Sequence, residues 1–289
     1  MIPYGSRRGW RDPDLVISHR QTERLTTLSL VIPAFNEEAR LPTLLQALAG
    51  AADAAVADAG LELHEIAIVD DGSSDGTRRM LTEAKADNPM LKPLLGSGEN
   101  RGKGAAIAEG VRRAGGDYVL LADVDLSTPL EELPKLMDAI RAGADIAIGS
   151  RGLPDSIVER GPAHRKLTGK TFSGAVRVLT GLQLRDTQNG FKLLPTTVAR
   201  ELFSEQLCEG FAFDVELLLR ADMAGLRIAE VPVLYVHDSR SRVQVASASV
   251  EMLRDVALLA YRLRPRSASR LRRQGRGRRL TDLSADEAD

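Results

Sequence analysis

The chain of 289 residues contains one cysteine and no long apolar run. The single cysteine, Cys208, excludes an intrachain disulfide and a zinc site built from cysteines. No stretch of about eighteen or more apolar residues occurs, so we expect no membrane span. The N-terminal region has no apolar run before Thr26, so we expect no signal peptide.

The sequence also lacks a net charge of either sign, since its formal charge is -1. A global basic field is therefore absent, and we expect no nucleic-acid partner. Arginine is concentrated near the end, with nine arginines and no acidic residue between Arg262 and Arg279. Together with an amphipathic helix before it, this tail predicts peripheral attachment to the cytoplasmic face of a membrane. The alternative is a disordered, solvated tail.

Short apolar runs alternate with helical patterns through the first half of the chain. This alternation predicts a mostly parallel, Rossmann-like sheet with helices on both faces, an α/β fold. The expected strands cover 28–35, 64–70, 91–95, 117–125 and 145–151, and the expected helices 36–48, 77–86, 104–114 and 131–141.

The second half is less regular. We expect helices at 163–180, 213–224 and 250–263, a loop entering a short strand at 186–195, and a strand at 227–236. The last helix should bury Leu253, Val256, Ala257, Ala260 and Leu263. These patterns predict a polar arm (1–25), a single domain (26–245), an amphipathic helix (246–264) and a disordered Arg-rich tail (265–289).

Polar residues follow the ends of several expected strands: Asn36-Glu37, Asp70-Asp71-Gly72-Ser73, Asp123 with Asp125, and Arg151. Ligands of parallel α/β sheets bind beyond the carboxyl ends of the strands. The convergence of several strand ends on polar residues therefore predicts one site at this edge.

Asp123 and Asp125 stand two residues apart in "LLADVDLSTP". On an extended segment, side chains at this spacing point the same way. Two such carboxylates suit Mg²⁺ or Mn²⁺, which prefer oxygen ligands and are often shared with substrate phosphates. The alternative is a solvated turn that begins a helix.

The segment "ENRGKGAA" places glycines and Lys103 at an expected helix start. A helix N-terminus offers free N–H groups and a positive dipole to phosphate. It is not a Walker A loop, because its spacing differs and the Ser/Thr is missing. The alternative is a plain loop and helix start, and "IVDDGSSDGT" could likewise be a turn with a capped helix.

Taken together, these segments resemble the family 2 inverting glycosyltransferases of the GT-A fold. The matching segments are "VIPAFNEE", "IVDDGSSDGT", "NRGKGAA", "LADVDLS" and "IGSR", in that order. In the second half, "DTQNGFKLL", "FAFDVELLLRA", "EVPVLYVH" and "SRV" look like the dolichyl-phosphate β-glucosyltransferase branch, related to the dolichol-phosphate mannose synthases. The resemblance covers roughly residues 28–245.

The resemblance implies roles for matching positions. The nucleotide sugar would be held by Pro33, Phe35, Glu37, Val69, Asp71, Lys103, Asp123, Val124 and Arg151. Asp123 and Asp125 would bind the metal and the diphosphate. Lys192, like Arg151, would face phosphates of donor or acceptor. His237 would be a third metal ligand or contact the diphosphate, and its alternative is a packed histidine at a strand end.

The implied reaction moves a hexose from a nucleotide sugar, UDP-glucose favoured over GDP-mannose, to a polyprenyl phosphate. That acceptor is largely dianionic at neutral pH, because its second pKa is about 6, so it needs no strong base. The catalytic residues would be Asp125, Lys192 and Asp186, of which Asp186 stands where related enzymes place a candidate base. Here Asp186 could instead orient the sugar or position Lys192.

Two acidic residues of the expected helix at 213–224 leave alternatives open. Asp214 and Glu216 are two apart, so they do not share a face, and one could cap or line the acceptor pocket. Either could equally be an ordinary helix carboxylate.

The chain departs from the branch at two places. It has Asn189 where relatives have a cysteine, and "HDSRSRV" is shorter and richer in arginine than the usual segment. Two other functions fit the same residues: a glycosyltransferase with a soluble phosphorylated acceptor, and a non-catalytic subunit that binds nucleotide sugars. The intact Asp123, Asp125 and Lys192 argue against the second.

Overall fold

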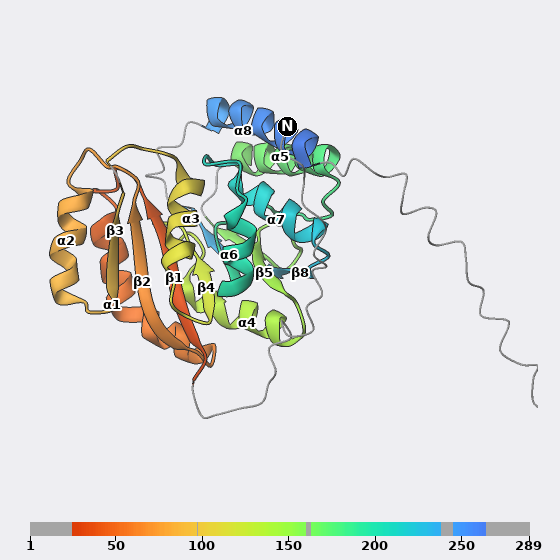
Figure 1. Ribbon diagram of the computed structural model, residues 1–289. Helices are drawn as coiled ribbons and strands as arrows, with labels where there is room; N and C mark the ends of the chain where they lie inside the picture. The colour runs from red at the N-terminus through yellow and green to blue at the C-terminus, as the bar shows by residue number, and fades with distance from the viewer. Residues whose placement is uncertain (1–24, 97, 160–162, 238–244, 264–289) are drawn as a thin grey trace, which may run out of the picture.

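The computed structural model describes residues 25–96, 98–159, 163–237 and 245–263 (Figure 1). The predicted tail at 265–289 lies outside them, as does the predicted arm except for its last residue.

A seven-stranded sheet forms the centre of the molecule, in the order β3-β2-β1-β4-β7-β5-β8. Neighbouring strands are parallel except around β7, which runs antiparallel to both β4 and β5. The expected mostly parallel sheet is therefore confirmed. The strands are β1 (Thr27–Ala34), β2 (Glu62–Asp70), β3 (Leu91–Leu95), β4 (Tyr118–Leu121), β5 (Ile146–Ser150), β7 (Lys192–Pro195) and β8 (Ile228–Pro232).

Helices cover both faces of this sheet (Figure 1). Because side chains alternate along a strand, Leu30 and Ile32 of β1 enter one core and Val31 enters the other. The first core includes side chains of α1 (Leu41–Asp58), α2 (Thr77–Asp87) and α4 (Leu133–Arg141), which follows the short 3-10 helix η2 (Leu130–Glu132). The second includes α3 (Lys103–Arg113), α5 (Ala163–Thr180), α6 (Thr196–Ser204), α7 (Phe213–Met223) and α8 (Val245–Leu263).

Two parts of the second half differ from the expectation. The strand expected at 227–236 is divided, because β8 ends at Pro232 and β9 (Leu234–Val236) pairs with β6 (Ile157–Glu159) in a separate two-stranded sheet. Helix α6 was not expected, although its buried Ala199, Leu202 and Phe203 have helical spacing.

Helix α8 lies beside α5 and also contacts α7 (Figure 1). Over residues 251–263, whose burial the structure describes, Val256, Leu259 and Ala260 are buried, whereas Ala257 is exposed. The expected buried face was thus wrong at Ala257, because the helix turns Leu259 inward instead. Among the helices of the described ranges, none is both long and apolar enough to cross a membrane.

Candidate active site

The carboxyl ends of β1, β2, β4 and β5 meet at one edge of the sheet. Because β7 is antiparallel, the loop before it reaches this same edge between β4 and β5. The structure thereby brings segments 36–37, 70–71, 123–125 and 151 together with the loop 186–191. This confirms that the strand-end residues share one location.

Asp123, directly beyond β4, is paired with the first residue of α3. Lys103 Nζ lies 2.7 Å from Asp123 Oδ1. Burial disfavours both charged forms, but their mutual attraction outweighs it. The pKa of Lys103 is raised, with Asp214 contributing after Asp123, and the pKa of Asp123 is lowered. Both groups are therefore charged at neutral pH.

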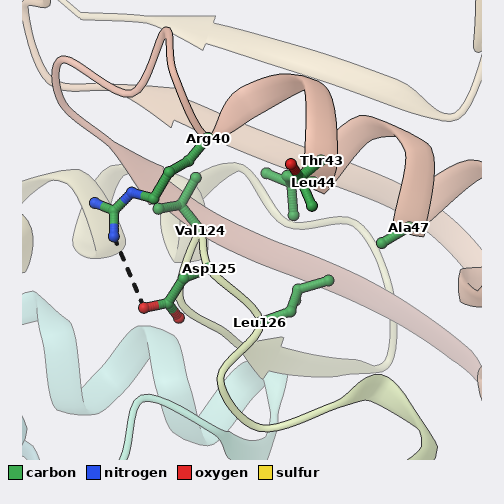
Figure 2. Close-up of a pocket in the computed structure, with 7 residues that line it drawn as sticks. All are labelled: Arg40, Thr43, Leu44, Ala47, Val124, Asp125 and Leu126. Atoms are coloured by element: carbon green, nitrogen blue, oxygen red, sulfur yellow. Dashed lines mark ion pairs between the residues drawn. The ribbon is translucent and has the colours of Figure 1, made fainter. Parts of the chain in front are cut away.

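Asp125 faces a different cation. Arg40 Nη1 lies 3.8 Å from Asp125 Oδ2, beside a pocket lined by Arg40, Thr43, Leu44, Ala47, Val124, Asp125 and Leu126 (Figure 2). Arg40 also donates to Glu37 through Nε, 2.6 Å from Oε2, and through Nη2 to Oε1. Burial first, and then the charge of Asp123, raise the pKa of Asp125. Two close carboxylates that repel each other in this way favour an additional cation.

Asp71, directly after β2, holds the loop that leads into α3. Its Oδ1 accepts from the backbone N–H of Arg101 at 3.0 Å, and its Oδ2 from that of Gly102 at 2.7 Å. Gly102 has a φ of 113° and a Cβ there would meet Glu209 O at 2.5 Å, so glycine is required. Asp71 thus fixes the position of the backbone from which Lys103 extends.

The other residues expected around the nucleoside lie near this edge, but they differ in how far their side chains are exposed to solvent. Val69 is buried in the core beneath α3, and Glu37 has its carboxylate on Arg40. Phe35, in contrast, is 40% exposed directly after β1, and Pro33 is partly exposed within β1. Val124 is buried and lines the pocket toward α1.

The turn after β2 is fastened to the turn after β1. Asn36 Oδ1 accepts from the N–H of Ser74 at 2.8 Å, and the Asn36 N–H donates to Ser73 Oγ at 2.9 Å. The Glu37 N–H donates to Thr77 Oγ1 at 2.7 Å. Asn36 adopts a positive φ of 54°, which asparagine tolerates better than most residues. These bonds give the edge a fixed outline on the β1–β2 side.

Arg151, directly after β5, forms a two-point ion pair with Asp186. Its Nε lies 2.6 Å from Oδ2 and its Nη2 2.9 Å from Oδ1, while its guanidinium carbon lies 4.9 Å from the centre of the Tyr235 ring. Burial works against the carboxylate, but Arg151 outweighs burial and lowers the pKa of Asp186 to about 2. Asp186 therefore positions Arg151 in this structure and is a poor proton acceptor at neutral pH.

Glu230 of β8 was missed at the sequence level. Its Oε1 accepts from Ser150 Oγ at 2.8 Å and from the backbone N–H groups of Arg185 and Asp186. Its Oε2 accepts a second bond from the Arg185 N–H. An acidic residue inside the otherwise apolar "AEVPV" was the signal that could have revealed it. It fixes the backbone of the Asp186 loop against β5.

Lys192 is fully buried at the start of β7, with an exposed fraction of 0%. Its Nζ lies 2.5 Å from Asp214 Oδ1 and 2.5 Å from Asn189 O. The expected position facing phosphates is therefore not the one observed, because a buried ammonium needs a partner and Asp214 of α7 supplies it. Asp186 does not position Lys192.

Glu216 of α7 forms hydrogen bonds with a different part of the chain. It accepts from the N–H groups of Leu207 and Cys208, and from Arg220 Nε at 2.7 Å. It therefore holds the 205–208 segment rather than lining the site edge.

The loop before β7 lies directly against Asp123. A Cβ on Gly190 would meet Asp123 Oδ2 at 2.5 Å, so only glycine leaves room for the carboxylate. Asn189 ties this loop to the Asp125 segment, since its Oδ1 accepts from Phe191 N–H at 3.0 Å and Thr128 Oγ1 at 3.3 Å. The loop therefore packs closely against the Asp123 carboxylate.

His237 does not join the two aspartates as the resemblance implies. Over the described ranges, no three His, Cys, Asp or Glu side chains lie close enough to hold a metal ion. His237 follows β9, where its N–H donates to Glu159 O at 3.2 Å. Asp123 and Asp125 remain as a two-carboxylate oxygen donor set, whose chemistry fits Mg²⁺ or Mn²⁺ when a substrate completes the coordination.

Comparison with known proteins assigns the chain to a family. The model of "Glycosyl transferase family 2" matches residues 29–203, which is more than half of the chain. The chain belongs to glycosyl transferase family 2. This glycosyltransferase is 33% identical over 243 residues to a dolichyl-phosphate beta-glucosyltransferase of Dictyostelium discoideum, covering 81% of this chain and 74% of the relative. It is also 33% identical over 219 residues to a polyprenol monophosphomannose synthase of Mycolicibacterium smegmatis, covering 74% and 79%.

Solved structures confirm the GT-A fold of this glycosyltransferase. Glucosyl-3-phosphoglycerate synthase from Mycobacterium tuberculosis in complex with phosphoglyceric acid superposes with a TM-score of 0.59 at 22% identity, covering 82% of this chain and 79% of that one. The same enzyme in complex with Mn²⁺, uridine-diphosphate and glucosyl-3-phosphoglycerate gives a TM-score of 0.57 at 22% identity, covering 81% and 78%.

Proposed function

We propose that this glycosyltransferase moves a hexose, with glucose favoured, from a nucleotide diphosphate sugar to a polyprenyl phosphate with inversion at the anomeric carbon. The relatives named for dolichyl phosphate and polyprenol monophosphate support the acceptor class. The observation that carries the proposal is the Asp123–Asp125 pair beyond β4, with Lys103, Arg40 and Arg151 around the same edge. Such an edge suits two phosphorylated substrates that repel each other.

Divalent Mg²⁺ or Mn²⁺, held by Asp123 and Asp125, would neutralise charge on the leaving diphosphate. The chain's own part is to place the two anions. Lys103, at the N-terminus of α3, would face the diphosphate, where the helix dipole also favours negative charge. Arg151, which is bonded to Asp186 and lies over the Tyr235 ring, would orient the acceptor phosphate.

A general base is not required in this mechanism. The acceptor phosphate is itself the nucleophile, and alignment with charge screening supplies the rate enhancement. Asp186 would therefore act by positioning Arg151, and Asp125 as a metal ligand. Lys192 would support the site from below, because its buried ammonium joins Asn189 of the loop before β7 to Asp214 of α7.

The test is transfer of radiolabelled sugar from UDP-glucose and, separately, GDP-mannose. Each donor is offered a polyprenyl phosphate or 3-phosphoglycerate, with Mn²⁺, Mg²⁺ or chelator. We expect a lipid product that requires metal, and a loss of at least about 100-fold in Asp125→Asn, since removing a metal ligand removes charge stabilisation. Asp138→Asn, which changes an exposed aspartate of α4, is the matched control.

If product forms only with 3-phosphoglycerate, the acceptor is a soluble phosphorylated molecule and not a polyprenyl phosphate. Unchanged turnover in Asp125→Asn would refute the metal mechanism.

We further propose peripheral membrane contact through α8 and the arginine-rich tail after it. Leu258 and Tyr261 of α8 are exposed, unlike the packed Val256. Polybasic segments gain about 1 kcal/mol per residue near anionic lipid. Flotation with phosphatidylserine vesicles at low salt should recover the full chain, and removal of residues 264–289 should abolish recovery. Equal recovery of both forms would refute the role of the tail.

A further inference from the structure

Lys103 is paired with Asp123, one of the two aspartates proposed to hold the metal ion. Its Nζ lies 2.7 Å from Asp123 Oδ1, which makes the two groups a close ion pair. A hard divalent cation binds carboxylate oxygens directly, at about 2.0–2.6 Å. A divalent cation bound to Asp123 would therefore repel the Lys103 ammonium and favour its release from the carboxylate.

The backbone of Lys103 is fixed, and its ammonium lies on Asp123 and 5.7 Å from the centre of the Phe213 ring. Asp71 bonds the two preceding N–H groups, and Ala105 N–H donates to Glu209 O at 3.1 Å. A Cβ on Gly104 would lie 2.7 Å from both Cys208 O and Phe213 Cβ, so the backbone is also closely covered. The lysine side chain is a flexible four-carbon stem, which allows the charge to change partner while the helix stays in place.

Arg40, which faces Asp125, is held differently. Two of its nitrogens donate to Glu37, and its Nη1 stands 3.8 Å from Asp125 Oδ2, beyond hydrogen-bond distance. Of these two cations, Lys103 therefore makes the closer contact with the aspartate pair.

We propose that Lys103 is an exchangeable counter-ion, which holds Asp123 while the site is empty and transfers to the donor diphosphate when a divalent cation takes Asp123. This inference rests on the proposed metal-dependent function. Since a cation at Asp123 repels Lys103, which is then available to the diphosphate, each ligand favours binding of the other. Such coupling is reciprocal between the two ligands.

The experiment measures binding rather than turnover. Mn²⁺ is titrated by calorimetry, and by electron paramagnetic resonance of free Mn²⁺, with and without UDP or GDP. In the wild type we expect the nucleoside diphosphate to tighten Mn²⁺ binding by about tenfold, within the usual range of coupling between two ligands. Lys103→Met should bind Mn²⁺ alone several-fold more tightly, bind the diphosphate alone more weakly, and lose most of the coupling.

Arg101→Met is the matched control, because Arg101 precedes the same helix but its side chain is exposed and paired with Glu209. It should behave as the wild type. Lys103→Gln, which removes the charge but keeps a polar side chain, should shift in the same direction as Lys103→Met. Circular dichroism checks that each variant is folded.

Opposite shifts in the two single-ligand affinities support the proposal, because general damage would weaken both. Unchanged or weaker Mn²⁺ binding in both Lys103 variants, with normal coupling in the wild type, would overturn it while leaving the proposed function intact. A wild type that binds no Mn²⁺ even with UDP or GDP would overturn the metal mechanism and this inference together.

Discussion

Lys192 and Asp214 form an ion pair that is sealed inside the protein, with Nζ and Oδ1 2.5 Å apart. Lys192 is the first residue of β7, where it lies between Leu121 of β4 and Ile148 of β5. Asp214 comes from the first turn of α7. The pair thus joins the middle of the sheet to a helix on its face, directly below the site edge.

Replacing one partner of this pair should lower the free energy of unfolding much more than replacing both partners. Lys192→Met leaves Asp214 buried without its cation, so we expect the free energy of unfolding to fall by about 3–5 kcal/mol. Lys192→Met combined with Asp214→Leu should recover a large part of that loss, as measured by urea denaturation. Arg79→Met, which removes one partner of the exposed Arg79–Glu83 pair, should cost only about 0–1 kcal/mol. A double variant less stable than the single one would contradict this account.

Asp186 should contribute to stability in a way that depends on pH. Its folded pKa, about 2, lies below the ordinary value of 3.8, so the contribution is present above pH 4 and is lost as the pH falls toward 2. We expect Asp186→Asn to lower the free energy of unfolding by about 2 kcal/mol at pH 6. Denaturation from pH 6 to pH 2.5 should show the two proteins converging. A difference that stays constant with pH would contradict the ion-pair explanation.

The acidic limb of the rate profile provides a separate check on Asp186. With this pKa the carboxylate is ionised throughout pH 5–9, so it should produce no inflection in kcat/KM there. Its substitution should weaken acceptor binding through Arg151 more than it changes the pH profile.

Gly190→Ala should disable the site while preserving the fold. The added Cβ would meet Asp123 Oδ2 at 2.5 Å and force the carboxylate aside. We expect a loss of Mn²⁺ affinity and of transfer by about tenfold or more, as expected when a group at the reacting centre moves by about 1 Å. Gly174→Ala in α5, where a Cβ meets nothing within 4 Å, is the matched control. Equal activity in both variants would show that Asp123 adapts.

Helix α8 offers a test of its packing. Val256→Asp places a charge in the core shared with α5 and α7 and should destabilise the protein by several kcal/mol. Ala257→Asp, one residue later on the exposed side, should change the free energy of unfolding by less than about 0.5 kcal/mol. Thermal denaturation of the two variants decides between the observed face and the one expected from sequence.

The alternation of apolar runs and helical patterns was sufficient to predict the parallel strands and the edge at which their polar ends meet. A distinctive polar segment follows each of the strands β1, β2, β4 and β5, as Asp123 follows β4. What could not be predicted depends on contacts between distant segments. The partner of Lys192 is twenty-two positions away, and Glu230 bonds a loop forty-five positions away.

The remaining errors in the predicted fold have local causes. The single run of apolar residues at 227–236 forms two strands that belong to different sheets. The spacing of apolar residues does not indicate which strand lies next to each of them. Ala257 has little side chain, so its apolar character says little about which side of α8 is buried.

The antiparallel strand β7 has a consequence for synthesis of the chain. The sheet cannot be completed from β4 to β5 until residues 192–195 have entered between them, although β5 ends at Ser150. Contacts between segments so far apart in sequence slow folding, because the intervening loop must close first. A nascent chain that has emerged only as far as β5 therefore exposes the unpaired sides of two strands, and chaperone capture should be most intense during that interval of translation.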